Sequence, residues 1–208
     1  MSHPLVAAAV GAGVRDARLL EALEAVPRAR FVPLGYEAAA DHDRPIPIGG
    51  GQVTTQPSLV ATMVEALELT GVERVLEVGT GLGYQAAILG RLAGEVWSVE
   101  RRPELAAAAA ANLAGKDNVH VVSGDGSEGL ADAAPYDAII VAAAHPCVPP
   151  PLAVQLAEGG RLIQPIGPSG REDVTLFRRR AGALVRDRVV ARAYFVPLCG
   201  RHGFEDTT

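Results

Sequence analysis

Short apolar runs alternate with helix-forming segments through most of this sequence, and that alternation constrains the fold more than any other feature. The apolar runs have the length of β-strands, and turn residues separate them from segments with helical periodicity. This order is typical of sheets in which each strand is followed by a crossover helix. We therefore predict an α/β fold with a doubly wound, mostly parallel, Rossmann-like sheet.

The expected elements cover most of the chain. Helices are predicted at residues 14–26, 58–69, 84–93, 103–113 and 152–156, and strands at 74–78, 95–100, 119–123, 137–142 and 161–165. Residues 174–179 and 191–197 are predicted to form a terminal antiparallel pair. Residues 31–57 are aperiodic and rich in Pro and Gly, and so long a loop is often functional. We expect a single domain over 1–208, with an N-terminal helix and lid segment at 1–57 and a core at 58–200.

Composition narrows the class of protein. The 208 residues carry a net charge of −5, whereas a nucleic-acid-binding surface needs a basic footprint. No run of about 18 apolar residues is free of charge, and the start has no basic segment typical of a signal peptide. Cys147 and Cys199 have no metal-ligand spacing, so neither a metal site nor a disulfide is expected. We expect a cytoplasmic monomer that binds neither nucleic acid nor membrane, with a frayed tail at 201–208.

A glycine-rich turn follows the first predicted strand of the core. Gly79, Gly81 and Gly83 lie between that strand and a helix, where a ligand can approach the backbone closely. In such sheets the ligand binds at the carboxyl ends of the strands. The residues from Gly81 to Ala86 also satisfy a loose dinucleotide fingerprint, and Glu100 has the spacing of a ribose contact. NAD therefore stays open as an alternative cofactor.

Acidic residues near three strand ends favour a cationic cofactor. Glu77, Glu100 and Asp125 are predicted to line one edge of the sheet. They would attract the sulfonium and ammonium groups of S-adenosylmethionine and repel a pyrophosphate. Glu100 suits either cofactor, because both contain ribose. Asp137 begins its strand instead of ending it, and is expected to be structural.

Several segments resemble the protein-L-isoaspartate O-methyltransferase family, in the family's order across residues 14–200. They are residues 26–33, 51–57, 75–87, 98–101, 124–126, 134–141, 155–162 and 195–198. The Gln-Pro segment at 51–57 and the Phe-Val-Pro-Leu ending at 195–198 are more specific than the glycine-rich turn. The resemblance implies a methyltransferase fold and S-adenosylmethionine-dependent methylation of the free carboxylate of L-isoaspartyl residues in damaged proteins.

The resemblance also implies the site residues. Its cofactor contacts map to Glu77, Gly79, Thr80, Gly81, Glu100, Asp125 and Gly126, with Val53, Thr54 and Gln56 in the lid that closes over the cofactor. Thr55 occupies the position of the family's usual active-site serine. The expected substrate-binding residues are His145, Pro197 and Leu198.

Methyl transfer to a carboxylate needs no general base, since the acceptor is already ionised at neutral pH. We therefore predict that Thr55 positions the acceptor by a hydrogen bond. His145 and Cys147 are not expected to act as a thiol–imidazole pair. Three alternatives stay open: a methyltransferase for a specialised peptide or small-molecule carboxylate, an NAD-linked oxidoreductase, and an inactive cofactor-binding module in which Thr55 marks the loss of activity.

Overall fold

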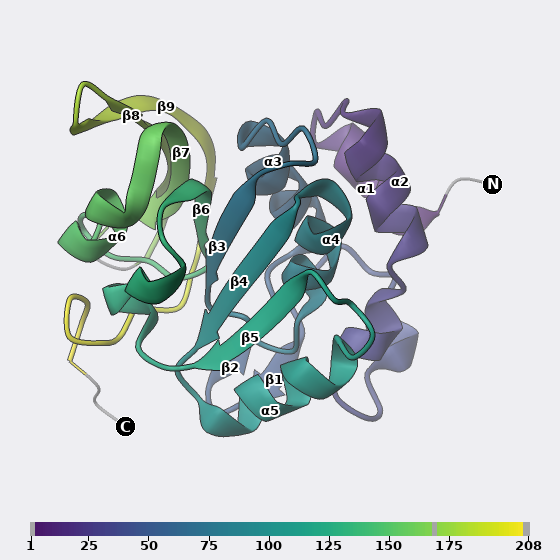
Figure 1. The fold of residues 1–208 in the computed structure, drawn as a ribbon. Coiled ribbons are helices and arrows are strands. Elements are labelled where there is room, and N and C mark those ends of the chain that lie inside the picture. The colour runs from purple at the N-terminus through teal and green to yellow at the C-terminus, as the bar shows by residue number, and fades with distance from the viewer. Residues whose placement is uncertain (1–2, 168–169, 206–208) are drawn as a thin grey trace.

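A seven-stranded sheet forms the centre of the computed structural model, which describes residues 3–167 and 170–205 (Figure 1). The strand order is β5-β4-β3-β6-β7-β8-β9. The parallel strands are β3 (Arg74–Val78), β4 (Glu95–Glu100), β5 (Val119–Ser123), β6 (Tyr136–Val141) and β7 (Leu156–Ile166). The antiparallel strands are β8 (Glu172–Arg180) and β9 (Ala183–Ala193). The predicted doubly wound sheet with a terminal antiparallel pair is confirmed.

Helices cover both faces of the sheet (Figure 1). They are α1 (Pro4–Gly11), α2 (Ala17–Ala25), α3 (Pro57–Ala66), α4 (Tyr84–Leu92), α5 (Pro103–Asn112) and α6 (Pro150–Gln155). One apolar core contains residues of the five helices from α1 through α5, together with Val75 and Ile140 of the sheet. A second core contains residues of α6 together with Leu76 and Ile139. Successive residues of β3 and β6 thus enter opposite cores, which is why both strands contain consecutive apolar residues.

The N-terminal segment contains more regular structure than predicted. The helix predicted at 14–26 begins later, because the Asp16 carboxylate accepts hydrogen bonds from the amides of Arg18 and Leu19 and caps α2. The preceding helix α1 was not predicted, since its Ala-rich sequence has almost no polar face. The aperiodic segment 31–57 contains the 3-10 turn η2 (Glu37–Ala39) and follows η1 (Arg28–Phe31). It then forms a small hairpin of β1 (Pro47–Gly49) and β2 (Gln52–Val53).

Two expectations at the C-terminal end are wrong. The last strand ends at Ala193 instead of extending over 191–197, and it begins at Ala183, in a charged and exposed stretch without the alternation of a half-buried strand. Residues 201–205 are not frayed. The Arg201 amide donates to Asp125 Oδ2 at 2.6 Å, and the His202 amide donates to Ser127 Oγ at 3.0 Å. The rest of the predicted tail, residues 206–208, lies outside the described residues.

In the described part of the chain, no helix combines the length and apolarity needed to cross a bilayer.

Candidate functional site

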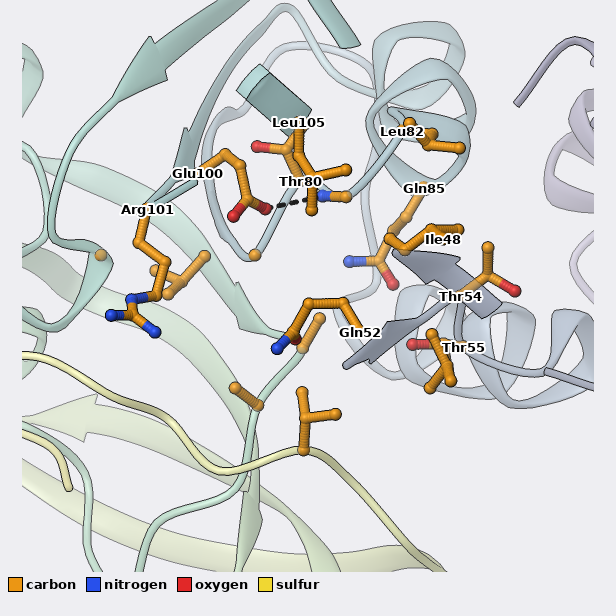
Figure 2. A pocket seen from close by; sticks show the side chains of 18 of the residues that line it. Ile48, Gln52, Thr54, Thr55, Thr80, Leu82, Gln85, Glu100, Arg101 and Leu105 are labelled. Carbon is orange, nitrogen blue, oxygen red and sulfur yellow. Dashed lines mark hydrogen bonds between the residues drawn. The ribbon is translucent and has the colours of Figure 1, made fainter. Parts of the chain in front are cut away.

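A cleft opens at the carboxyl edge of the sheet, between the glycine-rich turn after β3 and the β1–β2 hairpin (Figure 2). Its volume is about 920 Å³ including the open mouth. Core residues in its lining are Val60, Val78, Gly79, Thr80, Gly81, Leu82, Tyr84, Gln85, Val99, Glu100, Arg101, Leu105, Gly126, Ala142 and Ala143. The N-terminal segment contributes Phe31, Ile48, Gln52, Val53, Thr54 and Thr55, and the C-terminal segment contributes Val196, Pro197, Leu198 and Cys199. The cleft lies where the topology of a doubly wound sheet places a ligand.

The glycine-rich turn forms the floor of the cleft. Gly79 and Gly81 have φ angles of 93° and 56°, in the left-handed region that favours glycine. A Cβ atom on Gly81 would lie 3.2 Å from Ile48 Cδ1 of the hairpin, so the two segments approach closely here. The Gly81 amide donates to Glu100 Oε2 at 2.9 Å, the bond drawn in Figure 2. The turn is therefore held against the end of β4.

Glu100 is the predicted acid that lines the cleft. Its Oε1 accepts from the Arg102 amide at 3.0 Å, and the side chain is only 6% exposed. A carboxylate has about four acceptor positions, so both oxygens retain capacity for ligand hydroxyl groups. Ribose carries hydroxyl groups that can donate to such acceptors, so a ribose contact by Glu100 stays a prediction.

Glu77 does not line the cleft, contrary to the prediction that three acids share it. The side chain is fully buried beneath the turn, where Oε1 accepts from Gln85 Nε2 at 2.9 Å and Oε2 accepts from the Ser98 hydroxyl. Burial raises the pKa of Glu77 to about 8, although the two hydrogen bonds oppose the shift. The Ser98 hydroxyl also lies 2.6 Å from Thr80 Oγ1. Glu77 therefore supports the turn through Ser98, because its position on β3 faces α4 and not the cleft.

Asp125 is also absent from the lining, although its neighbour Gly126 is present. Its Oδ1 accepts from the amide and hydroxyl of Ser127 at 2.9 and 2.7 Å, and Oδ2 accepts from the Arg201 amide. Burial alone would raise the pKa of Asp125, but these hydrogen bonds outweigh it and hold the pKa below its ordinary value. The carboxylate was predicted to face a ligand cation, but its oxygens accept from Ser127 and from Arg201 of the C-terminal segment.

The lid residues divide into different roles. The Thr54 hydroxyl accepts from Arg28 Nη2 at 2.8 Å and from the Ile46 amide at 3.0 Å, which makes it part of the lid's own support. Gln56 donates to Asp43 Oδ2 at 2.8 Å and does not line the main cleft. Thr55 lines the cleft, and within residues 3–167 and 170–205 its hydroxyl has no hydrogen-bond partner. Figure 2 shows Thr55 across the cleft from Glu100.

A second cleft of about 730 Å³ adjoins the first. Its lining comprises Pro45, Val53, Thr54, Thr55, Gln56, Leu59, Ala142, Arg192, Ala193, Tyr194, Phe195 and Val196. Val53, Thr54, Thr55, Ala142 and Val196 line both clefts. Thr55 thus lies where two adjoining clefts meet.

The predicted substrate residues are separated by the structure. Pro197 and Leu198 line the main cleft, but His145 lines neither cleft, because its ring packs edge-on against Phe204 with the centroids 5.0 Å apart. Cys147 Sγ lies 3.6 Å from His145 Nδ1, at the protein surface and away from both linings. Asp137 is structural, as predicted: its carboxylate accepts from the Arg74 amide at 2.8 Å. Among the described residues, no cluster of His, Cys, Asp or Glu could hold a metal ion.

Sequence reasoning missed the polar residues behind the turn. Ser98 lies directly opposite Glu77 in the β3–β4 register and is fully buried, as a polar residue between the apolar Trp97 and Val99. This polar residue could have indicated a buried hydrogen-bond partner on the neighbouring strand, since buried polar groups need partners. Gln85 carried no such signal, because a Gln in the first turn of a helix is ordinary.

Comparisons with known proteins agree over most of the chain. A family model described as protein-L-isoaspartate(D-aspartate) O-methyltransferase matches residues 3–203. A protein-L-isoaspartate O-methyltransferase of Anaeromyxobacter dehalogenans (strain 2CP-1 / ATCC BAA-258) is 52% identical over 95% of this chain and 97% of its own. One from Koribacter versatilis (strain Ellin345) is 48% identical over 92% of this chain and 87% of its own.

Solved structures show the same fold. A protein-L-isoaspartate O-methyltransferase superposes with a TM-score of 0.87 at 32% identity, over 98% of this chain and 67% of the other. A Plasmodium falciparum structure, described as a putative protein-L-isoaspartate O-methyltransferase in complex with S-adenosyl-L-homocysteine, gives a TM-score of 0.81 at 21% identity, over 96% of this chain and 99% of the other. The predicted methyltransferase fold is confirmed.

Proposed function

The chain belongs to the protein-L-isoaspartate O-methyltransferase family, and on that premise we propose how its residues carry out the reaction. The protein is an S-adenosylmethionine-dependent enzyme that methylates L-isoaspartyl residues in protein repair. The observation that carries the residue assignment is the junction of the two clefts at Thr55. One cleft is assigned to the methyl donor and the other to the isoaspartyl side chain.

The main cleft fits the donor. Glycines at positions 79, 81 and 126 keep the floor free of side chains, and a Cβ atom on Gly126 would lie 2.5 Å from Val78 Cγ1. Buried Glu100 offers acceptors for ribose hydroxyl groups. Gly79, Thr80, Gly81, Glu100 and Gly126 would hold the donor from the core, and Val53 and Thr54 would cover it from the lid. Glu77 and Asp125 would act indirectly, by supporting the turn and the C-terminal segment, and Gln56 by anchoring the lid.

When bound, S-adenosylmethionine supplies a methyl group on a good leaving group, so the protein need not activate the acceptor by removing a proton. A carboxylate with a pKa near 4 is already ionised at neutral pH. The chain must hold that carboxylate in line and keep water out, which can contribute a large part of a rate enhancement. The Thr55 hydroxyl donates one hydrogen bond to the acceptor carboxylate in this assignment. Pro197 and Leu198 exclude water from the same end of the cleft.

The activity test uses a matched pair of peptides. One contains a single L-isoaspartyl residue, and its twin contains L-aspartate at the same position. We expect transfer of a labelled methyl group to the isoaspartyl peptide and background transfer to the twin. Equal transfer to both, or transfer to neither alongside tight S-adenosylhomocysteine binding, would contradict the substrate assignment.

Substitutions at position 55 test the positioning role. Thr55→Val keeps the shape of the side chain but removes the hydroxyl, and we expect kcat to fall by roughly tenfold or more because one hydrogen bond to a charged group is lost. Thr55→Ser keeps the hydroxyl and should retain activity. S-adenosylhomocysteine affinity should change little in either variant. Full activity in Thr55→Val would remove the role.

Three further properties belong to this proposal. The net charge of −5 supports protein rather than nucleic-acid substrates. Cys147 and Cys199 are both free thiols, which supports a reducing compartment such as the cytoplasm. We propose a monomer with one domain, in which residues 1–57 form the helical and lid segment and residues 58–200 form the core. Sedimentation equilibrium tests the oligomeric state.

A further inference from the structure

Arg28 is a fully buried cation that the proposed reaction does not use. It begins the 3-10 turn η1 and is only 1% exposed. No ion pair joins it to a carboxylate anywhere in the described chain. Burial lowers the pKa of Arg28, while the charges of Tyr84, Asp43 and Asp41 oppose that shift. A buried guanidinium without a paired carboxylate is costly to desolvate, so its hydrogen bonds must compensate.

Those hydrogen bonds all go to the lid. Arg28 Nη1 donates to the carbonyls of Ala40 and His42 at 3.1 and 3.0 Å. Arg28 Nη2 donates to the Arg44 carbonyl at 2.9 Å and to Thr54 Oγ1 at 2.8 Å. The guanidinium thus joins the two ends of the lid hairpin. It does so directly beside Thr55.

The same side chain also joins the lid to the core. The guanidinium carbon lies 5.8 Å from the centre of the Tyr84 ring, at the start of α4. Phe31, on the same 3-10 turn as Arg28, lies 6.0 Å from that ring, and both aromatic residues line the main cleft. Arg28 therefore contacts the lid on one side and a wall of the cleft on the other.

The geometry of this contact is specific to arginine. Four acceptors from four residues are matched by the planar fork of one guanidinium, whereas a lysine ammonium has three donors on a point charge. A lysine would keep the positive charge but could not hold both ends of the hairpin in this arrangement.

We propose that Arg28 is a positioning residue for methyl transfer, which fixes the lid so that the Thr55 hydroxyl stays at the junction of the two clefts. This inference rests on the proposed function of Thr55. Arg28 touches neither ligand space itself, since it lines neither cleft. Its effect passes through Thr54 and the backbone of residues 40–44.

The test compares Arg28→Lys and Thr54→Val with the wild type, using the full chain. Thr54→Val removes one acceptor of Arg28 and leaves three carbonyl bonds, so it perturbs the lid less than loss of the arginine. We expect kcat to fall about 10- to 100-fold in Arg28→Lys, the size of effect that a displacement of about 1 Å produces. Thr54→Ser keeps the hydroxyl acceptor, so we expect its kcat to be higher than that of Thr54→Val.

Arg179 provides a matched structural control. Its Nη1 donates to the carbonyls of Ala153, Val154 and Leu156 at 3.0, 2.8 and 2.6 Å, and it lines neither cleft. Arg179→Lys also loses a clamp on backbone carbonyls. We expect it to lower Tm without changing kcat, measured well below its Tm.

Hydrogen exchange provides a readout that does not need turnover. The Ile46 amide donates to Thr54 Oγ1, and the Thr54 amide donates to the Ile46 carbonyl at 2.8 Å. Both amides should exchange faster in Arg28→Lys than in the wild type. In Arg179→Lys their exchange rates should be unchanged. If wild-type protein fails to methylate the isoaspartyl peptide, the proposed function fails, and faster exchange would still support the clamp.

The inference is overturned by wild-type kcat in folded Arg28→Lys and Thr54→Val. It is equally overturned if kcat falls only in proportion to the fraction unfolded, as judged by circular dichroism at the assay temperature. A fall in kcat in Thr54→Ser as large as that in Thr54→Val would contradict the role of the hydroxyl acceptor.

Discussion

Individual side chains around the cleft are of two kinds: some line the cleft, and others hold the lining residues in place. Glu100 and Thr55 line the cleft, whereas Glu77 and Asp125 are turned into the protein. Acids of the second kind still influence the site, because Glu77 supports Thr80 through the Ser98 hydroxyl. Their sequence positions near the strand ends do not distinguish the two kinds. The direction of each side chain does.

The raised pKa of Glu77 has a consequence for stability. Its pKa rises from an ordinary value of 4.5 to about 8 in the folded protein. Between these values the folded state binds more protons than the unfolded state, so the free energy of unfolding falls as pH increases. We expect wild-type stability to decline by up to about 1.4 kcal/mol per pH unit in that window, relative to Glu77→Gln.

Glutamine is the matched variant because it resembles the protonated acid, with one acceptor and a donor group. Urea unfolding at several pH values between 5 and 8 measures the difference. Glu95→Gln is a control without such a slope: the Arg74 hydrogen bond lowers the pKa of Glu95 below its ordinary 4.5, so this carboxylate is ionised in both states from pH 5 to 8 and its contribution to stability is lost only at lower pH. Parallel stability profiles for wild type and Glu77→Gln would show that burial does not perturb Glu77.

Secondary-structure elements near the C-terminus were the least predictable from the sequence. The parallel strands were recognised because they are apolar runs such as Ile139–Val141 within β6, buried on both faces. Strand β9 is an exposed edge strand and carries charges at Arg186, Asp187 and Arg188. Its strand conformation is stabilised by pairing with β8 and not by a buried apolar face. No local pattern reports such pairing. The return of Arg201 and His202 to the loop after β5 is likewise a contact between segments distant in the chain.

This C-terminal turn is expected to support ligand binding. Gly200 has a φ of 149°, and a Cβ atom there would lie 2.1 Å from Asp125 Oδ1 and 2.6 Å from Ser127 Oγ. Gly200→Ala should therefore displace residues 199–203 and cost about 1–3 kcal/mol of stability, as overpacking does. S-adenosylhomocysteine affinity, measured by calorimetry, should also fall, because Leu198 and Cys199 line the cleft.

Gly11→Ala is the control for that substitution. A Cβ atom at Gly11 meets nothing within 4 Å, and the residue ends α1, away from the cleft. Stability and affinity should both stay near the wild-type values. An unchanged affinity in Gly200→Ala would mean that the C-terminal turn closes the protein surface without supporting the ligand.

The molecule as a whole brings segments that are far apart in its sequence to one cleft. The lining extends from Phe31 to Cys199, and the lid, the core turn and the C-terminal turn each contribute residues. Doubly wound topology predicted that the turns after β3, β4 and β5 meet at this edge, and the family resemblance implied that the lid and the segment at 195–198 join them. The sequence could not predict which of the three acids line the cleft and which are turned into the protein. That depends on the rotation of each strand about its axis and on the contacts of the terminal segment.

Ligand binding should therefore protect segments that are far apart in the sequence. At 100 times its Kd, S-adenosylhomocysteine should raise the free energy of unfolding by about 2.7 kcal/mol. In hydrogen exchange we expect it to slow the amides of residues 52–55 and of residues 198–203 together, since both segments border the same cleft. The tip of the β8–β9 hairpin at Ala181 and Gly182 is the internal control, because it lies outside both linings. NADH should produce neither effect. Protection confined to the turn at 79–83 would mean that the lid and the C-terminal turn do not respond to the ligand, and that the cleft is a property of the core alone.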